Sequence, residues 1–167
     1  IPKRDWSSDV CSSDLTLRPL RPDDFDALFA AASDPLIWEQ HPESTRYQEP
    51  VFRRYFQGSL DSGGGFLISD ARTGQAIGSS RYFGFDAAAS EVEIGWTFLT
   101  RPYWGGPANA ELKRLMLDHA FQFVTRVIFI VGVTNYRSQR AMEKIGGVRA
   151  GMRHQDGRDS VIYEIRR

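Results

Sequence analysis

The stretch that decides the fold is residues 91–121, which read EVEIGWTFLTRPYWGGPANAELKRLMLDHAF. Its first nine residues alternate in polarity, which predicts a strand whose apolar face carries Val92, Ile94, Trp96 and Phe98. A loop rich in glycine and proline follows, and a long helix is predicted from about Asn109. A glycine-rich loop that leads into a helix can bind an anion through free backbone N–H groups, although such a loop is more often a plain turn.

The elements on both sides of this stretch predict a mixed α/β sheet. A continuous apolar run, RVIFIVGV at 126–133, is typical of a strand buried on both faces. The other predicted elements are a short edge strand at 16–22, helices at 23–34 and 49–60, two strands joined at ARTG (71–74), a helix at 135–147 and a final hairpin around Asp156–Gly157. This order predicts a mostly antiparallel sheet of about seven strands.

Composition excludes several classes of protein. The 167 residues are typical of one domain, and Lys+Arg and Asp+Glu both number 21, which argues against nucleic-acid binding. No apolar run approaches the roughly 18–20 residues of a membrane span. The single cysteine and the lack of CxxC or HExxH patterns argue against disulfides and metal sites. We therefore expect a cytoplasmic protein with no metal, membrane or nucleic-acid partner.

Four stretches, in the expected order, resemble the GNAT (GCN5-related) N-acetyltransferases and, within them, the branch that includes ribosomal-protein N-terminal acetyltransferases. The resemblance covers residues 16–167. The four stretches are LRPLRPDDFDALFAAASDP (17–35), EVEIGWTFL (91–99), WGGPANAELKRLMLDHAF (104–121) and NYRSQRAMEKIGGVRAG (135–151).

The resemblance implies one domain over 16–167, with helices on both faces of the sheet and with its fourth and fifth strands splayed apart. It implies that acetyl-CoA binds in that gap as a cosubstrate, and that a primary amine attacks it directly in a ternary complex. The acceptor is then a protein N-terminus or a small-molecule amine, and the protein is a monomer or a homodimer. The alternatives are a non-catalytic acyl-CoA-binding or regulatory domain and a nucleotide-binding fold outside this family.

Two residues are candidate catalytic groups. Glu93 stands where some relatives carry a carboxylate, which makes it the candidate base, and the alternative is a solvated strand residue. Ser138 fills the serine place of the family's N-x-x-S motif, which makes it the candidate donor to the leaving sulfur. Its alternative role is a helix N-cap. Where many relatives have a tyrosine acid, this chain has Met142.

The resemblance also implies coenzyme-binding residues, which are Phe98, Leu99, Thr100, Arg101, Trp104, Gly105, Gly106, Ala108, Asn109, Asn135 and Arg140. The loop departs from the family form R/Q-G-x-G-x-G/A. Pro107 replaces a glycine and supplies no N–H, and Trp104 replaces the basic residue. The positive charge is then expected from Arg101, Lys113 or Arg114.

Three aromatic residues are candidates for acceptor binding: Trp38, Tyr47 and Tyr163. The first two belong to the region of the two N-terminal helices, which flank the acceptor pocket in the family. The alternative is that aromatic residues here belong to the core, and that Tyr163 pairs across the final hairpin. For Asn135 the alternative is a turn residue at a strand end.

Residues 5–15, DWSSDVCSSDL, match none of these elements and contain the only cysteine, Cys11. The stretch resembles the conceptual translation of a widely used DNA-sequencing adaptor. The alternative is a genuine disordered leader rich in serine and aspartate. We expect residues 1–15 to be a disordered, non-native leader and the natural chain to begin near Thr16.

Overall fold

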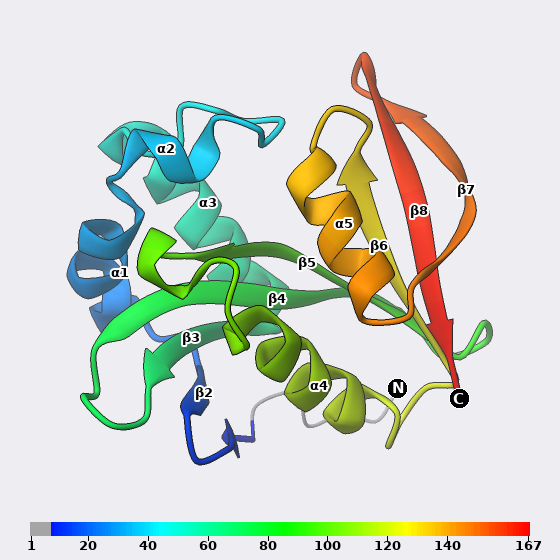
Figure 1. The fold of residues 1–167 in the computed structure, drawn as a ribbon, viewed down its shortest axis with the longest axis horizontal. Coiled ribbons are helices and arrows are strands. Elements are labelled where there is room, and N and C mark those ends of the chain that lie inside the picture. Colours follow the sequence, from blue (N-terminus) through cyan, green and yellow to red (C-terminus); the bar gives the residue numbers. More distant parts are fainter. Residues whose placement is uncertain (1–7) are drawn as a thin grey trace.

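The computed structural model describes residues 8–167, which form an eight-stranded sheet with five α-helices (Figure 1). The strands are β1 (Val10–Cys11), β2 (Leu15–Pro19), β3 (Gly65–Asp70), β4 (Ala76–Asp86), β5 (Glu91–Leu99), β6 (Arg126–Gly132), β7 (Val148–Gln155) and β8 (Arg158–Arg166). The helices are α1 (Phe25–Ala32), α2 (Pro35–Trp38), α3 (Glu49–Ser62), α4 (Ala108–Ala120) and α5 (Tyr136–Lys144). The strand order is β1-β2-β3-β4-β5-β6-β8-β7.

The predicted sheet is confirmed: its neighbouring strands are antiparallel except β5 and β6, which are parallel. Helices cover both faces. On one face, buried residues of α4 such as Leu112 and Met116 form a first core cluster with the sheet. On the other face, α1 and α3 contribute Leu28, Phe52 and Phe56 to a second, largely aromatic cluster. Each face is thus closed by apolar side chains at helical spacing.

Strand β5 changes face at Trp96. The register with β4 gains one residue on the β5 side between Gly95 and Phe98, and Trp96 has a φ of 52°, which is uncommon outside glycine. One extra residue moves the following side chains to the opposite face. Ile94 accordingly packs in the first cluster, whereas Phe98 packs in the second. The prediction that Trp96 and Phe98 continue the face of Ile94 is therefore wrong.

Strands β5 and β6 are paired only at one end. Three residue pairs join them, and the last is Glu93 with Ile128, although both strands continue beyond it. Figure 1 shows the two strands diverging from that end. At the paired end, Arg126 of β6 forms ion pairs with Glu91 of β5 and with Glu164 of β8. The sheet is therefore fastened on one side of a widening gap.

The N-terminal region differs from the expectation of disorder. Val10 and Cys11 form β1, which pairs with β2, and Leu15 is buried in the first core cluster. Disorder is therefore the wrong description for residues 8–15, whereas residues 1–7 lie outside the described part. That 5–15 is a non-native leader and that 16–167 is a single domain remain predictions. Within residues 8–167, no helix is both long and apolar enough to cross a membrane.

Candidate functional site

Two cavities meet where β5 and β6 separate. The first, here the loop cavity, has a volume of about 650 Å³ and lies between the end of β5, the loop that follows it, α4 and α5. The second, here the hairpin cavity, has a volume of about 550 Å³ and lies between β5, β6 and the β7–β8 hairpin. Both volumes are typical of small-molecule sites. The residues that line both cavities, here the junction, are His41, Thr97, Lys113, Ser138 and Met142.

The loop cavity presents backbone N–H groups. Gly105 has a φ of 72°, a conformation that favours glycine, and a Cβ on Gly105 or Gly106 would meet no atom within 4 Å. Helix α4 has Pro107 at its N-cap, and no side chain caps its first turn, where Asn109 lines the cavity. The N–H groups at the start of α4 are therefore available for an anionic ligand such as a diphosphate.

Most of the cations that line the loop cavity come from α5. Arg140 and Lys144 lie one turn apart and line the cavity together with Arg137. Neither Arg140 nor Lys144 forms an ion pair with another residue in the described part of the chain. Of these, only Arg140 was predicted. The i, i+3, i+7 spacing of the three cations was the available sequence signal, because it places them on one helix face.

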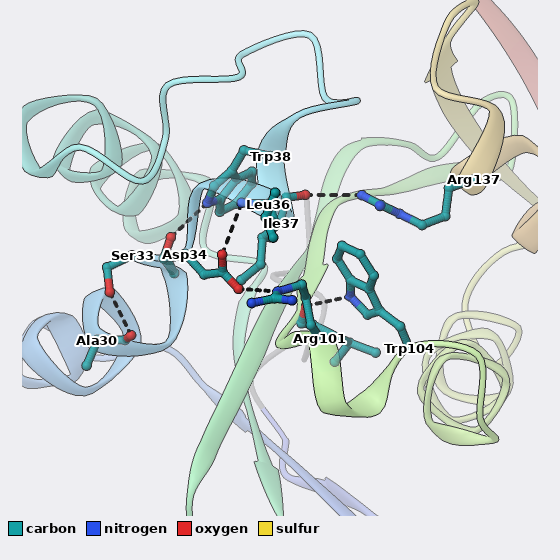
Figure 2. Close-up of polar contacts among 11 residues, drawn as sticks. Ala30, Ser33, Asp34, Leu36, Ile37, Trp38, Arg101, Trp104 and Arg137 are labelled. Atoms are coloured by element: carbon teal, nitrogen blue, oxygen red, sulfur yellow. Dashed lines mark hydrogen bonds and ion pairs between the residues drawn. The ribbon is translucent and has the colours of Figure 1, made fainter.

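Of the three cations expected from the sequence, Lys113 lines the loop cavity, whereas the other two lie elsewhere. Arg101 forms an ion pair with Asp34 outside the loop cavity (Figure 2). Arg114 forms an ion pair with Glu111, at 2.7 Å between Nη2 and Oε1, on the outer face of α4. Both are thus engaged with carboxylates and do not line the cavity.

Trp104 and Arg137 connect opposite walls of the loop cavity (Figure 2). The indole Nε1 of Trp104 donates a hydrogen bond to the carbonyl oxygen of Leu99 at 2.8 Å. The guanidinium carbon of Arg137 lies 3.8 Å from the centre of the Trp104 ring, and its Nη2 donates to the carbonyl of Ile37 at 3.1 Å. Trp104, which stands where the family has a basic residue, thus has the guanidinium of Arg137 stacked on its ring.

Glu93 lines the hairpin cavity at the last residue pair before β5 and β6 separate. Burial raises the pKa of Glu93 to about 7, against the opposing effect of Arg153 and Arg81 nearby. A carboxylate with such a pKa can accept a proton from an amine at neutral pH. The Glu93 side chain is half-buried, and its role as a base or as a solvated strand residue stays a prediction.

Ser138 lies at the junction, in the first turn of α5. The N-cap of that helix is Asn135, whose Oδ1 accepts the N–H of Ser138 at 3.4 Å. The capping role considered for Ser138 therefore belongs to Asn135. The Ser138 hydroxyl does not cap the helix and can interact with a ligand in either cavity. Asn135 is buried and lines the hairpin cavity rather than the loop cavity.

Lys113 is a buried cationic group at the junction. It is only 3% exposed, and its Nζ donates to Thr97 Oγ1 at 2.7 Å, which in turn lies 2.7 Å from Ser80 Oγ. No carboxylate of the described residues lies at ion-pair distance from it. Burial lowers the pKa of Lys113 to about 7. The sequence placed Lys113 only among phosphate-binding candidates, because nothing in a helical pattern distinguishes a buried lysine from a solvated one.

His41, to which the sequence analysis assigned no role, is also at the junction. Its ring lies 5.0 Å from that of Trp38. Burial lowers the pKa of His41 to about 4, and Arg46 and Arg137 act in the same direction. The imidazole is therefore neutral at physiological pH. The irregular segment that carries it gave no sequence signal of a site.

The structure brings most of the predicted site residues to the cavities. Those that line the loop cavity are Phe98, Leu99, Trp104, Gly105, Gly106, Asn109, Ser138 and Arg140. Glu93, Asn135 and again Ser138 line the hairpin cavity.

Six predicted residues line neither cavity: Thr100, Arg101, Ala108, Trp38, Tyr47 and Tyr163. The three aromatic residues of this set belong to the core. Trp38 is 1% exposed in the second cluster, against which Tyr47 packs, and Tyr163 is fully buried in the first. Within the described residues, no group of three or more His, Cys, Asp or Glu side chains is placed to hold a metal ion.

Comparison with known proteins agrees with this architecture. The family described as acetyltransferase (GNAT) domain matches residues 14–148. A GCN5-related N-acetyltransferase from Brucella melitensis has a TM-score of 0.80 and 23% identity, and the match covers 96% of this chain and 79% of that one. The acetyltransferase from Agrobacterium tumefaciens strain C58 has a TM-score of 0.73 and 24% identity, covering 96% and 95%.

RimJ from Mycobacterium smegmatis, in complex with CoA-disulfide, has a TM-score of 0.75 and 20% identity, covering 96% of this chain and 88% of that one. At these identities the structural matches establish the fold, whereas the family match rests on sequence over most of the chain. A search of curated proteins gives no match. From the match over residues 14–148, this chain belongs to the GNAT acetyltransferase family.

Proposed function

We propose that this protein transfers an acetyl group from acetyl-CoA to a primary amine, either a protein N-terminus or a small-molecule amine, by direct attack in a ternary complex. The observation that best supports this is the junction of two differently built cavities. The loop cavity offers N–H groups and cations suited to a diphosphate, and the hairpin cavity offers a carboxylate suited to an amine. Acetyl-CoA supplies the acetyl group as an activated thioester.

Glu93 serves as the base in this proposal. An amine attacks only as the neutral species, so its ammonium form must lose a proton near the point of transfer. The raised pKa of Glu93, about 7, makes it half-deprotonated at neutral pH. Its place in the hairpin cavity, at the start of the gap between β5 and β6, puts the carboxylate on the acceptor side.

Lys113 and Ser138 serve the leaving sulfur. Both line the junction, where the Lys113 ammonium and the Ser138 hydroxyl can each donate to a developing thiolate. We assign the thioester oxygen to a backbone N–H near Trp96, because the bulge takes one residue of β5 out of the β4 ladder. Holding both reactants at the junction converts a bimolecular step into an effectively unimolecular one.

A thiol-release assay with acetyl-CoA and a panel of primary amines tests the proposal. Release of CoA that depends on the amine, with a mass increase of one acetyl group on that amine, is the expected result. Measurable CoA binding without release for any amine would favour the alternative of a non-catalytic acyl-CoA-binding domain. Absence of both binding and release would overturn the proposal.

A further inference from the structure

The hairpin cavity carries more positive than negative charge. Its charged lining residues are Arg46, Lys113, Arg153, Arg158, Glu93 and Asp156. The three arginines come from three separate segments: the loop after α2, β7 and β8. Burial raises the pKa of Glu93 to about 7, so this carboxylate is only partly ionised at neutral pH and offsets the arginines less than a solvated one would.

The arginines of this cavity have carboxylates near them but form no ion pairs with them. None of the three forms an ion pair or a side-chain hydrogen bond with another residue in 8–167. Glu43 lies near Arg46 and Arg158, but it makes no ion pair with them and accepts a hydrogen bond from Thr45 Oγ1 at 2.7 Å. Arg153 and Arg158 are exposed and Arg46 is half-buried, so their guanidinium groups can exchange water for a ligand.

Arg46 is held in position by aromatic rings. Its guanidinium carbon lies 5.0 Å from the centre of the Tyr55 ring and 5.6 Å from that of Trp38. Burial lowers the pKa of Arg46, whereas Tyr55 and Glu43 oppose this shift and Arg158 adds to it; the guanidinium remains charged at physiological pH. Arg46 and Arg158 thus share one nearby carboxylate, that of Glu43, and their two positive charges exceed its single negative charge.

We infer that the acceptor is a primary amine that also carries a carboxylate, with Arg46 and Arg158 binding the carboxylate while Glu93 faces the amine. This inference rests on the proposed acetyl transfer and adds the chemical class of its acceptor. The planar fork of arginine matches a carboxylate with two parallel hydrogen bonds. Amines without an anionic group, such as polyamines, are repelled by the same arginines.

Matched acceptors test the inference in two arms. The first arm compares a free α-amino acid with its carboxamide, and the second compares peptides that begin with Asp or Asn and end in a carboxamide. The anionic acceptor is expected to have kcat/KM at least about tenfold higher, because only its carboxylate can pair with the half-buried Arg46 and the exposed Arg158. Whichever arm responds identifies the source of the carboxylate. Equal rates in both arms would overturn the inference.

Charge variants locate the effect. Arg158→Gln is expected to reduce the preference for the anionic acceptor at least about threefold and to leave CoA binding unchanged. Arg54→Gln removes the same charge from the exposed face of α3 and is the matched control. Arg46→Lys keeps the charge next to the rings but removes the fork, so the preference should fall in a folded protein. A preference that survives both cavity substitutions contradicts the assignment.

Product binding separates this inference from the proposed transfer. Calorimetry on the CoA-loaded protein compares an N-acetyl amino acid with its N-acetyl carboxamide. Preferential binding of the anionic product without turnover of any amine would support the anion site and overturn the acetyl transfer. Turnover without any preference for anionic acceptors or products would support the acetyl transfer and overturn the anion site.

Discussion

The loop cavity and the hairpin cavity are built by different means. The loop cavity depends on consecutive backbone groups around Gly105 and on one face of α5. The hairpin cavity depends on side chains from the segment at 41–46 and from β5, β6, β7 and β8. Backbone geometry is encoded locally, whereas the charge state of Glu93 depends on segments that bury it from elsewhere in the chain. A local sequence motif can therefore predict the loop cavity, whereas it cannot predict the charge state of the hairpin cavity.

The sharpest test of the acceptor side is Glu93→Gln. We expect kcat/KM to fall by about 10²-fold or more, because the amine loses its base, with CoA affinity nearly unchanged. In the unaltered protein the activity should rise with pH through about 7, since Glu93 acts when deprotonated, and the variant should lack this rise. Full pH profiles of both proteins check this. Normal turnover in the variant would show that Glu93 is not the base.

Lys113→Met tests the group shared by both cavities. We expect turnover to fall by about tenfold, since the thiolate loses a cation, and the decline in activity above about pH 7 should disappear. Lys113→Arg, which keeps the charge, is the control. An unchanged turnover in the methionine variant would exclude Lys113 from catalysis.

The same variant has a predicted effect on stability. The pKa of Lys113 falls from its ordinary 10.5 to about 7 on folding, so the unfolded chain binds more protons between these values. Stability therefore rises with pH across that window, and Lys113→Met should reduce this rise and unfold at a higher temperature at pH 6. Thermal unfolding from pH 6 to 9 measures it. An equal pH dependence in both proteins would contradict the burial of a titrating lysine.

Gly105→Ala tests the loop cavity, which depends on backbone N–H groups. Its φ of 72° disfavours a side chain, so the loop should shift and KM for acetyl-CoA should rise about tenfold with little change in kcat. Gly74→Ala is a matched control, because Gly74 has a φ of 73° in a turn that lines neither the loop cavity nor the hairpin cavity. Equal effects of the two substitutions on KM would show that strain, and not the loop cavity, is responsible.

The smallest effect is expected for Tyr163→Phe. The hydroxyl donates to Glu143 Oε1 at 3.3 Å, and the ring is fully buried away from both cavities. Its loss should lower the free energy of unfolding by about 1 kcal/mol and leave the acceptor KM unchanged. A raised acceptor KM would restore the role that the sequence first suggested for Tyr163.

The sequence predicted those parts of the fold whose signals are local. Alternation, apolar periodicity and turn residues identified every strand from β2 to β8, because each pattern reports the burial of one element. The bulge at Trp96 was not predicted, since it depends on the register with β4. Strand β1 was missed because two residues carry no period, and the proposed adaptor origin of residues 5–15 remains a prediction.

In the candidate site, too, residues with a local sequence signal were predicted, whereas residues whose role depends on distant segments were not. Gly105, Gly106 and Glu93 were identified from a motif and its neighbouring strand, and all three line the cavities. Arg46 was not identified, and Lys113 was named only as a possible phosphate-binding cation, because an arginine in a loop and a lysine in a helix are usually solvated. Only the packing of distant segments around them reveals a charge removed from water.

The ion pairs of Arg126 with Glu91 and Glu164 have a mechanical consequence. The pair with Glu91 fastens β6 to β5, and the pair with Glu164 fastens β6 to β8; beyond Glu93 the two strands separate, with β5 held by β4 and β6 held by β8. The point from which the two strands diverge is thus held by three charged residues that line neither cavity.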